Sequence, residues 1–362
     1  MADRAQVMAF RVAAHGLAHR GQDRPGDLDV LDLGVQEYTP GSLQVALAAR
    51  TTADFDDDRL LMVWAARGAP HLHRRRDLPA LVQQLWPLTD ADAATRIKSG
   101  QMPHAGKLGI EAFRVTAAAF REVLTHSMAR GDVSTQVSKR VPKELTYECR
   151  SCKARHIGGN IWQVAGLAGG VEVESRGREA TLGPIPDAPP IPEANVGIAD
   201  LIATYLRFLG PATPAEVAKY VGTATAEIKQ VWPGDLAEIA VEGKKTWLPA
   251  SAVKEFESPP PPEGVRLLPG MDPLLQARDR DLLVPGRDRQ REVWRVLGNP
   301  GVVLADGEIV GVWRAKLVAR KRVDLTVTPF GPLTPPQRAD IEEESMHVAR
   351  ARGVPSATVT FE

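Results

Sequence analysis

Cysteine is nearly absent from this chain of 362 residues, which contains only two. A disulfide framework like that of small secreted domains is therefore not expected. Long apolar runs are also missing, since no stretch approaches the roughly 18 uncharged apolar residues of a membrane-spanning helix. The first residues, MADRAQVMAFRVAAHG, carry charges within their apolar part and show no cleavage site, so we expect no secretion signal. These absences predict a soluble, cytoplasmic protein.

Net charge is absent as well, because 45 Lys and Arg residues balance 45 Asp and Glu residues. Nucleic-acid-binding domains usually carry a clear basic excess, so this balance weakens a nucleic-acid-binding interpretation. Binding depends on where the charge lies, however. The chain has two local basic clusters, HLHRRR (71–76) and RAKLVARKR (314–322). Either cluster could form a local nucleic-acid-binding face.

Common enzyme signatures are missing too. The chain contains no P-loop, no GxGxxG after a strand, no G-x-S-x-G and no HExxH. Nucleotide hydrolases, dehydrogenases, serine hydrolases and zinc proteases are therefore disfavoured, and no nucleotide cofactor is expected.

Proline is concentrated in stretches that divide the chain. GPIPDAPPIPEAN (183–195) and ESPPPPEG (257–264) contain too many prolines for a helix or a central strand, and they are typical of stiff linkers. A softer break, KSGQMPHAGKLG (98–109), is rich in glycine and polar residues. We expect four domains, over residues 1–100, 105–183, 194–256 and 264–362.

The first three segments share a plan, in which helices are followed by a β-hairpin. They open with the apolar helices AQVMAFRVAAHGLAHR, GIEAFRVTAAAFREVLTH and VGIADLIATYLRFLG. In the third segment, Thr213 and Pro214 provide an N-cap and a first-turn proline for a second helix. The expected hairpins are LLMVWAARGAPHLHRRRD, VEVESRGREATLG (171–183) and IAVEGKKTWLPA. This order is typical of the winged-helix form of the helix-turn-helix, and its repetition predicts a tandem array.

The last segment is different, because alternating strand patterns dominate it. Three such stretches are LLPGMDPLLQARDRDLL, GVVLADGEIVGVWRAKLVARKRVDLTVTPF and SATVTFE. Between them, TPPQRADIEEESMHVARARG has the Thr-Pro-Pro start and the final glycine of a single helix. We expect a small β-barrel or curled sheet with a covering helix, and thus an α+β protein with three winged helices and a C-terminal barrel.

Four stretches carry a resemblance to a known family: LGVQEYTPGSLQVALAAR, VWAARGAPHLHRRRDL, LLPGMDPLLQARDRDLL and LADGEIVGVWRAKL. In this order they resemble the winged-helix DNA-binding superfamily that contains the alkylpurine and crosslink-repair DNA glycosylases of the YcaQ and AlkZ type. The resemblance implies three winged helices in a C-shaped arrangement with a C-terminal β-barrel. It also implies double-stranded DNA as the partner.

The resemblance gives the triplet Gln36-Glu37-Tyr38 a candidate catalytic role. Glycosylases of this family carry Gln-apolar-Gln or Gln-apolar-Asp at this place, facing the lesion. Gln36 matches the first position, whereas Glu37 replaces the apolar residue and Tyr38 replaces the final Gln or Asp. Hydrolysis of an N-glycosidic bond needs a positioned water and stabilisation of an oxocarbenium-like sugar. A tyrosine hydroxyl can hold water but is a poor base near neutral pH. The alternative is that the three residues form an ordinary polar junction.

The cluster HLHRRR is the first candidate DNA contact. Strand alternation places His71 and His73 on one face. Arg74, Arg75 and Arg76 are expected to contact the groove or the phosphates, since wings commonly touch the DNA backbone. The alternative is a solvated strand end before the helix DLPALVQQLWP.

Further candidates lie at two other places. The resemblance implies that Arg67, at the tip of the first hairpin, is a basic residue near the motif loop, where it would contact the DNA backbone. Arg320 and Lys321, in ARKR (319–322), are candidate contacts to flanking DNA or part of a solvated strand edge. Asp272, before a proline, is expected to form a turn rather than to act as an acid.

Cys149, Cys152 and His156 have the C-x2-C-x3-H spacing of half a zinc site. Completion would require a distant ligand such as His104 or His126. A zinc knuckle, a reversible disulfide and a simple turn are the alternatives, and no metal or other cofactor is expected for the activity.

Three functions fit these observations. The first is a monofunctional DNA glycosylase that removes bulky or crosslinked N-alkylated purines by attack of water at C1′. The second is a DNA-binding lesion sensor or transcription-related protein without catalysis. The third is a protein-interaction scaffold, since winged helices are reused in this way. A monomer is expected.

Overall fold

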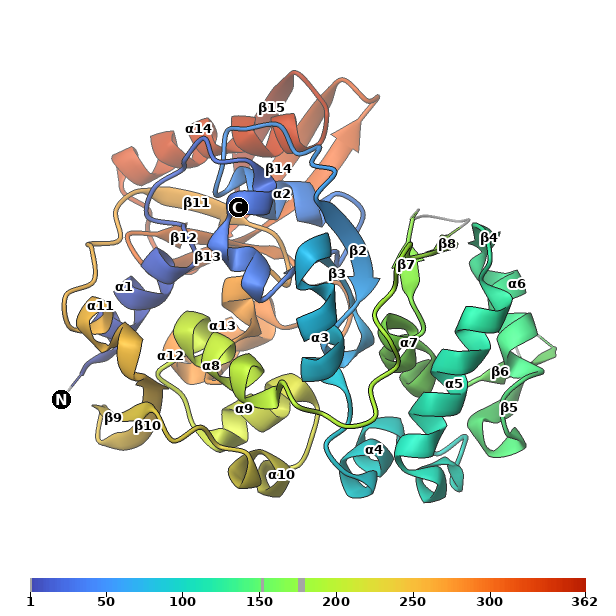
Figure 1. Ribbon diagram of the computed structural model, residues 1–362. Coiled ribbons are helices and arrows are strands. Elements are labelled where there is room, and N and C mark those ends of the chain that lie inside the picture. Colours follow the sequence, from blue (N-terminus) through green and yellow to red (C-terminus); the bar gives the residue numbers. More distant parts are fainter. Residues whose placement is uncertain (1, 151–152, 175–179) are drawn as a thin grey trace. The chain divides into compact units, whose positions relative to one another are not determined.

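The computed structural model of the protein describes residues 2–150, 153–174 and 180–362. Helices and strands occur along the whole chain, so the fold is mixed α+β, as predicted (Figure 1). The chain divides into two compact units. Unit 1 consists of Met1–Asp58, Ala203–Thr213 and Gly234–Glu362, and unit 2 consists of Arg59–Ile202 and Pro214–Pro233. Within the described ranges, no helix is both long and apolar enough to cross a membrane.

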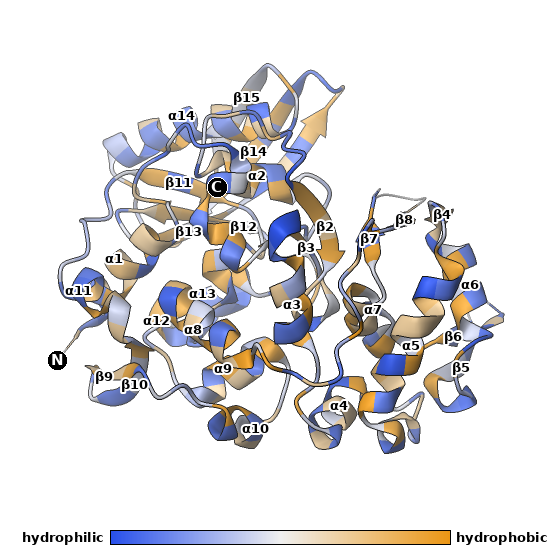
Figure 2. Ribbon diagram, in the orientation of Figure 1, coloured by the Kyte–Doolittle hydropathy of each residue, from blue (hydrophilic) through white to orange (hydrophobic). Residues whose placement is uncertain are grey.

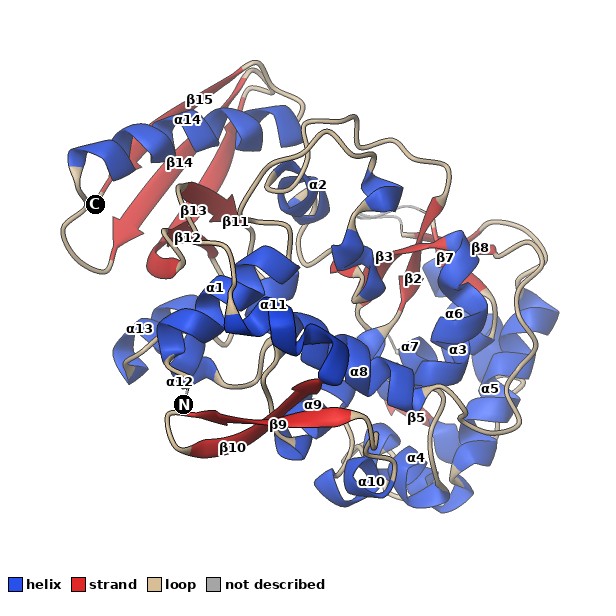
Figure 3. Cartoon of the chain, turned by 60° about the vertical axis from the view of Figure 1, so that its left-hand side comes forward, coloured by secondary structure: helices blue, strands red, loops and turns tan. Residues whose placement is uncertain are grey.

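A five-stranded sheet forms the C-terminal part of unit 1 (Figure 3). Neighbouring strands are antiparallel except the last pair, which is parallel. A parallel pair needs a crossover connection, and the helix α14 (Pro335–Ala351) provides it. The strands, in spatial order, are β11 (Val265–Leu268), β12 (Gly301–Ala305), β13 (Glu308–Val318), β14 (Arg322–Pro329) and β15 (Ser356–Phe361).

Helix α14 covers this sheet and contacts both edge strands, β11 and β15. It starts with a capping box, in which the Thr334 hydroxyl accepts from the Gln337 backbone N–H and the Gln337 side chain accepts from the Thr334 N–H. The predicted covering helix is therefore confirmed. The core beneath it also contains Val45 and Ala48, on helix α2 (Ser42–Ala48) or at its C-terminal end. This packing fixes the helix that directly follows the candidate motif.

A second core in unit 1 joins the N-terminal helix to a hairpin. Helix α1 (Arg4–Ala14) contributes Val7 and Phe10, which pack with residues of β9 (Leu236–Val241), β10 (Lys244–Pro249) and α11 (Val253–Glu257). The hairpin β9–β10 turns at Glu242 and Gly243, whose φ values are 47° and 80°. Positive φ at both central residues is typical of a tight hairpin turn, and the predicted hairpin is confirmed.

Unit 2 contains the hairpin predicted in the first segment. Its strands are β2 (Leu60–Trp64) and β3 (Pro70–Arg74), which pair antiparallel. Every residue of β2 is buried, and the strand is hydrophobic in Figure 2. The Trp64 ring packs against Phe120 and Trp162, with ring centroids 6.4 and 5.6 Å away. These aromatic rings join the hairpin to α5 (Ile110–Val123) and α7 (Gly159–Ala168).

Unit 2 also contains the predicted second hairpin, together with a hairpin of β5 (Thr146–Cys149) and β6 (Ala154–Ile157) that was not predicted. Strands β7 (Val171–Val173) and β8 (Thr181–Pro184) pair antiparallel at the predicted second hairpin, whose residues 175–179 lie outside the described part. Helices α9 (Pro214–Val221) and α10 (Thr225–Gln230) also belong to unit 2. The remaining helices and strands in the unit, or spanning its boundary, are α3 (Leu78–Leu85), α4 (Asp90–Ile97), β4 (Met128–Ala129), α6 (Arg130–Ser138) and α8 (Ile198–Leu209).

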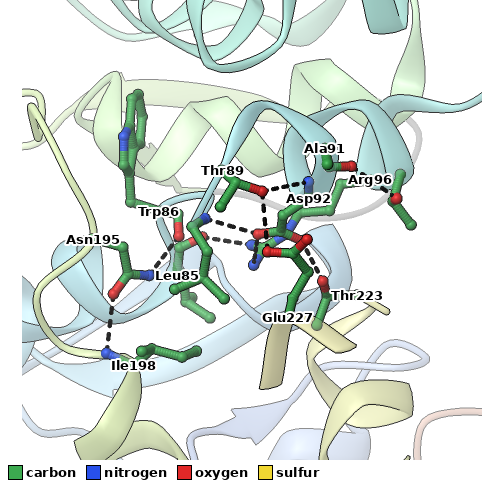
Figure 4. A network of polar contacts seen from close by, with 12 residues as sticks. Leu85, Trp86, Thr89, Ala91, Asp92, Arg96, Asn195, Ile198, Thr223 and Glu227 are labelled. Atoms are coloured by element: carbon green, nitrogen blue, oxygen red, sulfur yellow. Dashed lines mark hydrogen bonds and ion pairs between the residues drawn. The ribbon is translucent and has the colours of Figure 1, made fainter. Parts of the chain in front are cut away.

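A buried polar network ties α4 to the region around α10 (Figure 4). The Asp92 carboxylate accepts from the Leu88 N–H at 2.8 Å, pairs with the Arg96 guanidinium, and accepts from the Thr223 hydroxyl. The Thr89 hydroxyl caps α4 and donates to Glu227 at 3.0 Å. A buried carboxylate with this many partners holds the two segments together, because its charge is compensated where water is excluded.

Candidate active site

The triplet Gln36-Glu37-Tyr38 lies in unit 1, in the turn between the short strand β1 (Val35–Gln36) and helix α2. The Ser42 hydroxyl closes this turn, because it accepts from the backbone N–H groups of Tyr38 at 2.9 Å and Thr39 at 3.1 Å. Gly41, with φ of 83°, is the N-cap of α2, a backbone conformation that favours glycine. The loop is thus a fixed turn rather than a mobile connection.

Glu37 is buried and serves this turn structurally. One carboxylate oxygen accepts from the Gly41 N–H at 3.1 Å, and the other accepts from the Leu43 N–H at 2.8 Å. These donors belong to the first turn of α2, where unpaired N–H groups and the helix dipole favour a negative charge. The position of the carboxylate therefore favours a helix-capping role over that of a general base.

Gln36 is half-buried, and its side chain is oriented from a distant part of the chain. The Nε2 of Gln276 donates to the Oε1 of Gln36 at 3.1 Å and to the Met271 carbonyl at the same distance. Gln276 is itself buried, at the end of the 3-10 turn Pro273–Gln276. This contact fixes which way the Gln36 amide faces.

Tyr38 connects the motif loop to the loop before β12. Its hydroxyl accepts from the backbone N–H of Asn299 at 3.1 Å. Beside this contact lies a cavity of about 290 Å³, lined among others by Thr39, Asn299 and Arg314. The Asn299 Oδ1 is buried without a hydrogen-bond partner among the described residues.

The acidic residues near Gln276 are committed to ion pairs. Asp272 is buried and forms two hydrogen bonds of 2.9 Å with the Arg50 guanidinium, and it also caps the Pro273–Gln276 turn. The turn-forming role predicted for Asp272 is therefore confirmed. Asp279 pairs with the buried Arg11 at 2.6 Å. Both carboxylates hold the loop that carries Gln276. Neither is free to act as a base beside the Gln36 amide.

The cluster HLHRRR lies in unit 2, and much of it is buried. His71 and His73 lie with their ring centroids 6.1 Å apart, and each is only 3% exposed. Burial, aided by the neighbouring His73, lowers the pKa of His71 from 6.5 to about 3, so this imidazole is neutral at physiological pH. Arg74 is also buried and pairs with Asp77 at 3.1 Å. Burial argues against DNA contacts by His71, His73 and Arg74, because DNA phosphates can bind only to exposed side chains.

Arg75 and Arg76 follow β3 and are exposed. The Arg75 guanidinium lies 3.2 Å from Glu172, whereas the Arg76 side chain is 71% exposed and lies 3.6 Å from Asp77. Exposed pairs of this kind are weak, so both side chains can turn toward an anionic partner. The accessible part of the predicted contact cluster is thus Arg75 and Arg76.

Arg67 lies in the turn of the hairpin β2–β3 and has φ of 57°. Its guanidinium lies over the Tyr220 ring at 5.0 Å and donates to the Tyr220 carbonyl at 2.7 Å. It lines a cavity of about 190 Å³ together with Trp64 and Arg96. The side chain is therefore packed against α9 rather than extended from a hairpin tip.

Arg320 and Lys321 are exposed at the turn between β13 and β14 in unit 1. Strand β13 pairs with β12 only up to Trp313, while its pairing with β14 continues to Val318. The end of this hairpin therefore extends beyond β12 as a ribbon, and it carries exposed basic residues.

The possible zinc half-site is described only in part. Cys149 lies on β5 and His156 on β6, in one antiparallel hairpin, while Cys152 lies outside the described residues. Over the ranges that the structure describes, no group of three His, Cys, Asp or Glu residues could hold a metal ion.

Two residues of the site were not singled out from the sequence. Gln276 lies within LLPGMDPLLQARDRDLL, a stretch that carried the resemblance, but nothing local shows that it faces Gln36. Asn299 lies in a connection with no motif. Each of them contacts a triplet residue that lies more than 200 positions away in the sequence.

The family described as DNA glycosylase AlkZ-like matches residues 30–351, nearly the whole chain. This chain belongs to the DNA glycosylase AlkZ-like family. An interstrand DNA cross-link repair glycosylase from Streptomyces sahachiroi is 34% identical over 173 residues, covering 45% of this chain and 45% of that protein. The chain therefore spans less than half the length of that curated relative. The solved structure of Streptomyces sahachiroi DNA glycosylase AlkZ matches with a TM-score of 0.78, at 24% identity over 100% of both chains, which shows a shared fold.

Proposed function

We propose that this AlkZ-like chain is a monofunctional DNA glycosylase that excises bulky N-alkylated or crosslinked purines from double-stranded DNA. The observation that carries the proposal is the half-buried Gln36 amide, oriented by Gln276 on a turn that Glu37 and Ser42 hold rigid. Preorganised polar groups of this kind stabilise developing charge without reorganisation during the reaction.

The reaction breaks the bond between C1′ and the purine nitrogen. The bonding electrons leave with the base, which an N-alkyl group makes a good leaving group. A water oxygen attacks C1′ and releases its proton to the solvent. In this proposal Gln36 positions the water through its amide, and the Tyr38 hydroxyl helps to hold it. Glu37 contributes by fixing the turn, and no metal or nucleotide cofactor is needed.

The proposal includes the finer architecture predicted from the sequence. It consists of three winged helices over 1–100, 105–183 and 194–256 and a small C-terminal β-barrel over 264–362. Hairpins that follow helices in each of the first three segments support it, as does the covered five-stranded sheet of the last. The proposed DNA contacts are the exposed Arg75, Arg76, Arg320 and Lys321, with Arg67 in a supporting position.

A second function is favoured by one observation, which is that the only carboxylate of the triplet is a buried helix cap. The chain would then bind damaged DNA without catalysis. Incubation with duplexes carrying N7-alkylated guanine or a crosslink distinguishes the two functions. Free alkylated base and an abasic site are expected products of the glycosylase. Binding of several adducts without base release would contradict the glycosylase and support a lesion sensor.

A further inference from the structure

The connection between α13 (Arg287–Val293) and β12 carries two exposed apolar side chains. Val296 is 100% exposed and Leu297 is 87% exposed, more than any other large hydrophobic residue that the structure describes. They are adjacent and form the tip of the loop. Isolated exposed apolar residues are ordinary, but a fully exposed pair on a projecting loop is typical of a surface that inserts into a partner.

The base of this loop is fixed to the candidate active site. The Asn299 N–H donates to the Tyr38 hydroxyl at 3.1 Å, and the Arg314 guanidinium donates to the Gly298 carbonyl at 3.0 Å. The Asn299 amide also contacts the Met271 sulfur at 3.3 Å, and Gly298 has φ of 68°. The tip therefore projects from a defined place beside the triplet, only two residues from the contact to Tyr38.

The surroundings of the tip identify the class of partner. Arg314 is exposed, and the ribbon that begins with it carries Lys316, Arg320 and Lys321, also exposed. None of these four has a carboxylate partner among the described residues, whereas Arg322 pairs with Asp324 at 2.8 Å. Arg314 contacts the base of the loop, and the other three basic residues follow it along the ribbon. An apolar tip and unpaired basic side chains together complement duplex DNA, which has an anionic backbone and an apolar base stack.

We propose that Val296 and Leu297 form a wedge that enters the base stack of duplex DNA next to the nucleotide held at Gln36 and Tyr38. Arg314 binds a flanking phosphate and fixes the depth of insertion. The wedge fills the space left by the displaced nucleotide, so burial of its apolar surface offsets part of the cost of unstacking. This inference rests on the proposed function for the identity of the displaced nucleotide.

The test uses the full chain and a duplex with 2-aminopurine beside an abasic-site analogue, so that its readout needs no catalysis. The wedge variant is Val296→Ser with Leu297→Ser. The matched control is Val196→Ser with Met346→Ser, which removes two other exposed apolar side chains, 78% and 47% exposed. All four side chains are exposed, so both variants should fold.

The wild-type chain and the control should raise 2-aminopurine fluorescence on saturation, because the probe base becomes unstacked. The wedge variant should lose most of this rise and bind roughly tenfold more weakly, while the salt dependence of its affinity stays unchanged because it removes no phosphate contact. Arg314→Ala should lower the salt slope by about one, because it removes a phosphate contact. It should reduce the fluorescence rise only in part, because the loop base keeps its bond from Asn299 to Tyr38.

The outcomes separate the wedge from the proposed activity. Unstacking by a wild-type chain that releases no base supports the wedge and contradicts the glycosylase. Base release with equal fluorescence in wild type and wedge variant overturns the wedge alone. A change of molar mass in the wedge variant would show that the tip contacts protein, and absence of DNA binding by the wild-type chain would overturn both.

Discussion

Gln276 donates its side-chain N–H to the Oε1 of Gln36 across 3.1 Å, although 240 residues separate them in sequence. The resemblance implies Gln or Asp at the third motif position, where this chain has Tyr38. The contact places a second amide beside Gln36 from outside the triplet. The contact orients the Gln36 side chain, and in the proposed reaction Gln276 is a positioning residue.

Replacing Gln276 should slow base release without weakening DNA binding. Gln276→Met keeps the volume but removes the donor, so single-turnover release should fall about tenfold, the scale of a misplaced catalytic group. Adding Gln276→Met to Gln36→Ala should cost little more, because the second residue acts through the first. Additive losses, or a loss confined to DNA affinity, would contradict the positioning role.

Replacing Glu37 should affect stability more than the reaction. Glu37→Gln keeps one acceptor oxygen but turns an NH₂ group toward the N–H groups at the start of α2, which should cost about 1–3 kcal/mol of unfolding free energy. The rate per folded molecule should stay within about threefold. A roughly 100-fold loss of rate with unchanged stability would instead identify Glu37 as the general base.

Arg74 and Arg76 should respond differently to substitution. Arg76→Ala removes an exposed charge, so the salt slope of DNA affinity should fall by about one while the melting temperature holds. Arg74→Ala removes a buried side chain and leaves a cavity, so the melting temperature should drop. Salt titrations and thermal unfolding of both variants measure this, and identical behaviour would refute the assignment.

Acidification should destabilise both units through buried neutral histidines. Burial lowers the pKa of His15 in unit 1, aided by Arg50, and that of His71 in unit 2, each from 6.5 to about 3. Below pH 6.5 the unfolded chain takes up the proton and the folded chain does not, so stability present at pH 7 is lost as the pH falls from 6.5 toward 3. Each histidine should cost about 2 kcal/mol at pH 5.

Urea unfolding at pH 7 and pH 5 tests this prediction. His15→Asn and His71→Asn retain an amide for the bonds to the Arg11 and Ala69 carbonyls but remove the titrating ring. Each variant should lose its share of the pH dependence. An unchanged dependence in both variants would show that other groups cause it.

Local signals in the sequence predicted part of the secondary structure. The prediction was wrong for LLPGMDPLLQARDRDLL, which was expected to form strands, because only its first two residues belong to a strand, while Pro273–Gln276 and Arg280–Leu283 are helical. The start of α14 and the β9–β10 turn depend on neighbouring residues, through a capping box and a tight-turn conformation, and both were predicted correctly. The alternation along β3 correctly placed His71 and His73 together. It could not show that this face is covered, because burial depends on segments distant in sequence.

The candidate site was predictable only where its contacts are local in sequence. The sequence located the triplet, and the resemblance supplied its role. Glu37 belongs to the triplet with the candidate catalytic role, but the partners of its carboxylate are the N–H groups four and six residues later. Gln276 and Asn299 could not be found, since their contacts to Gln36 and Tyr38 arise only from tertiary packing.

The most direct test is single-turnover release of an N7-alkylated guanine from a defined duplex by the wild-type chain and by Gln36→Ala, with DNA affinity measured for both. The wild-type chain should release the base well above the spontaneous rate. Gln36→Ala should be slower by about 100-fold with nearly unchanged affinity, the pattern of an interaction made mainly in the transition state. Absence of release by the wild-type chain on several adducts, or equal rates for the two proteins, would contradict the account.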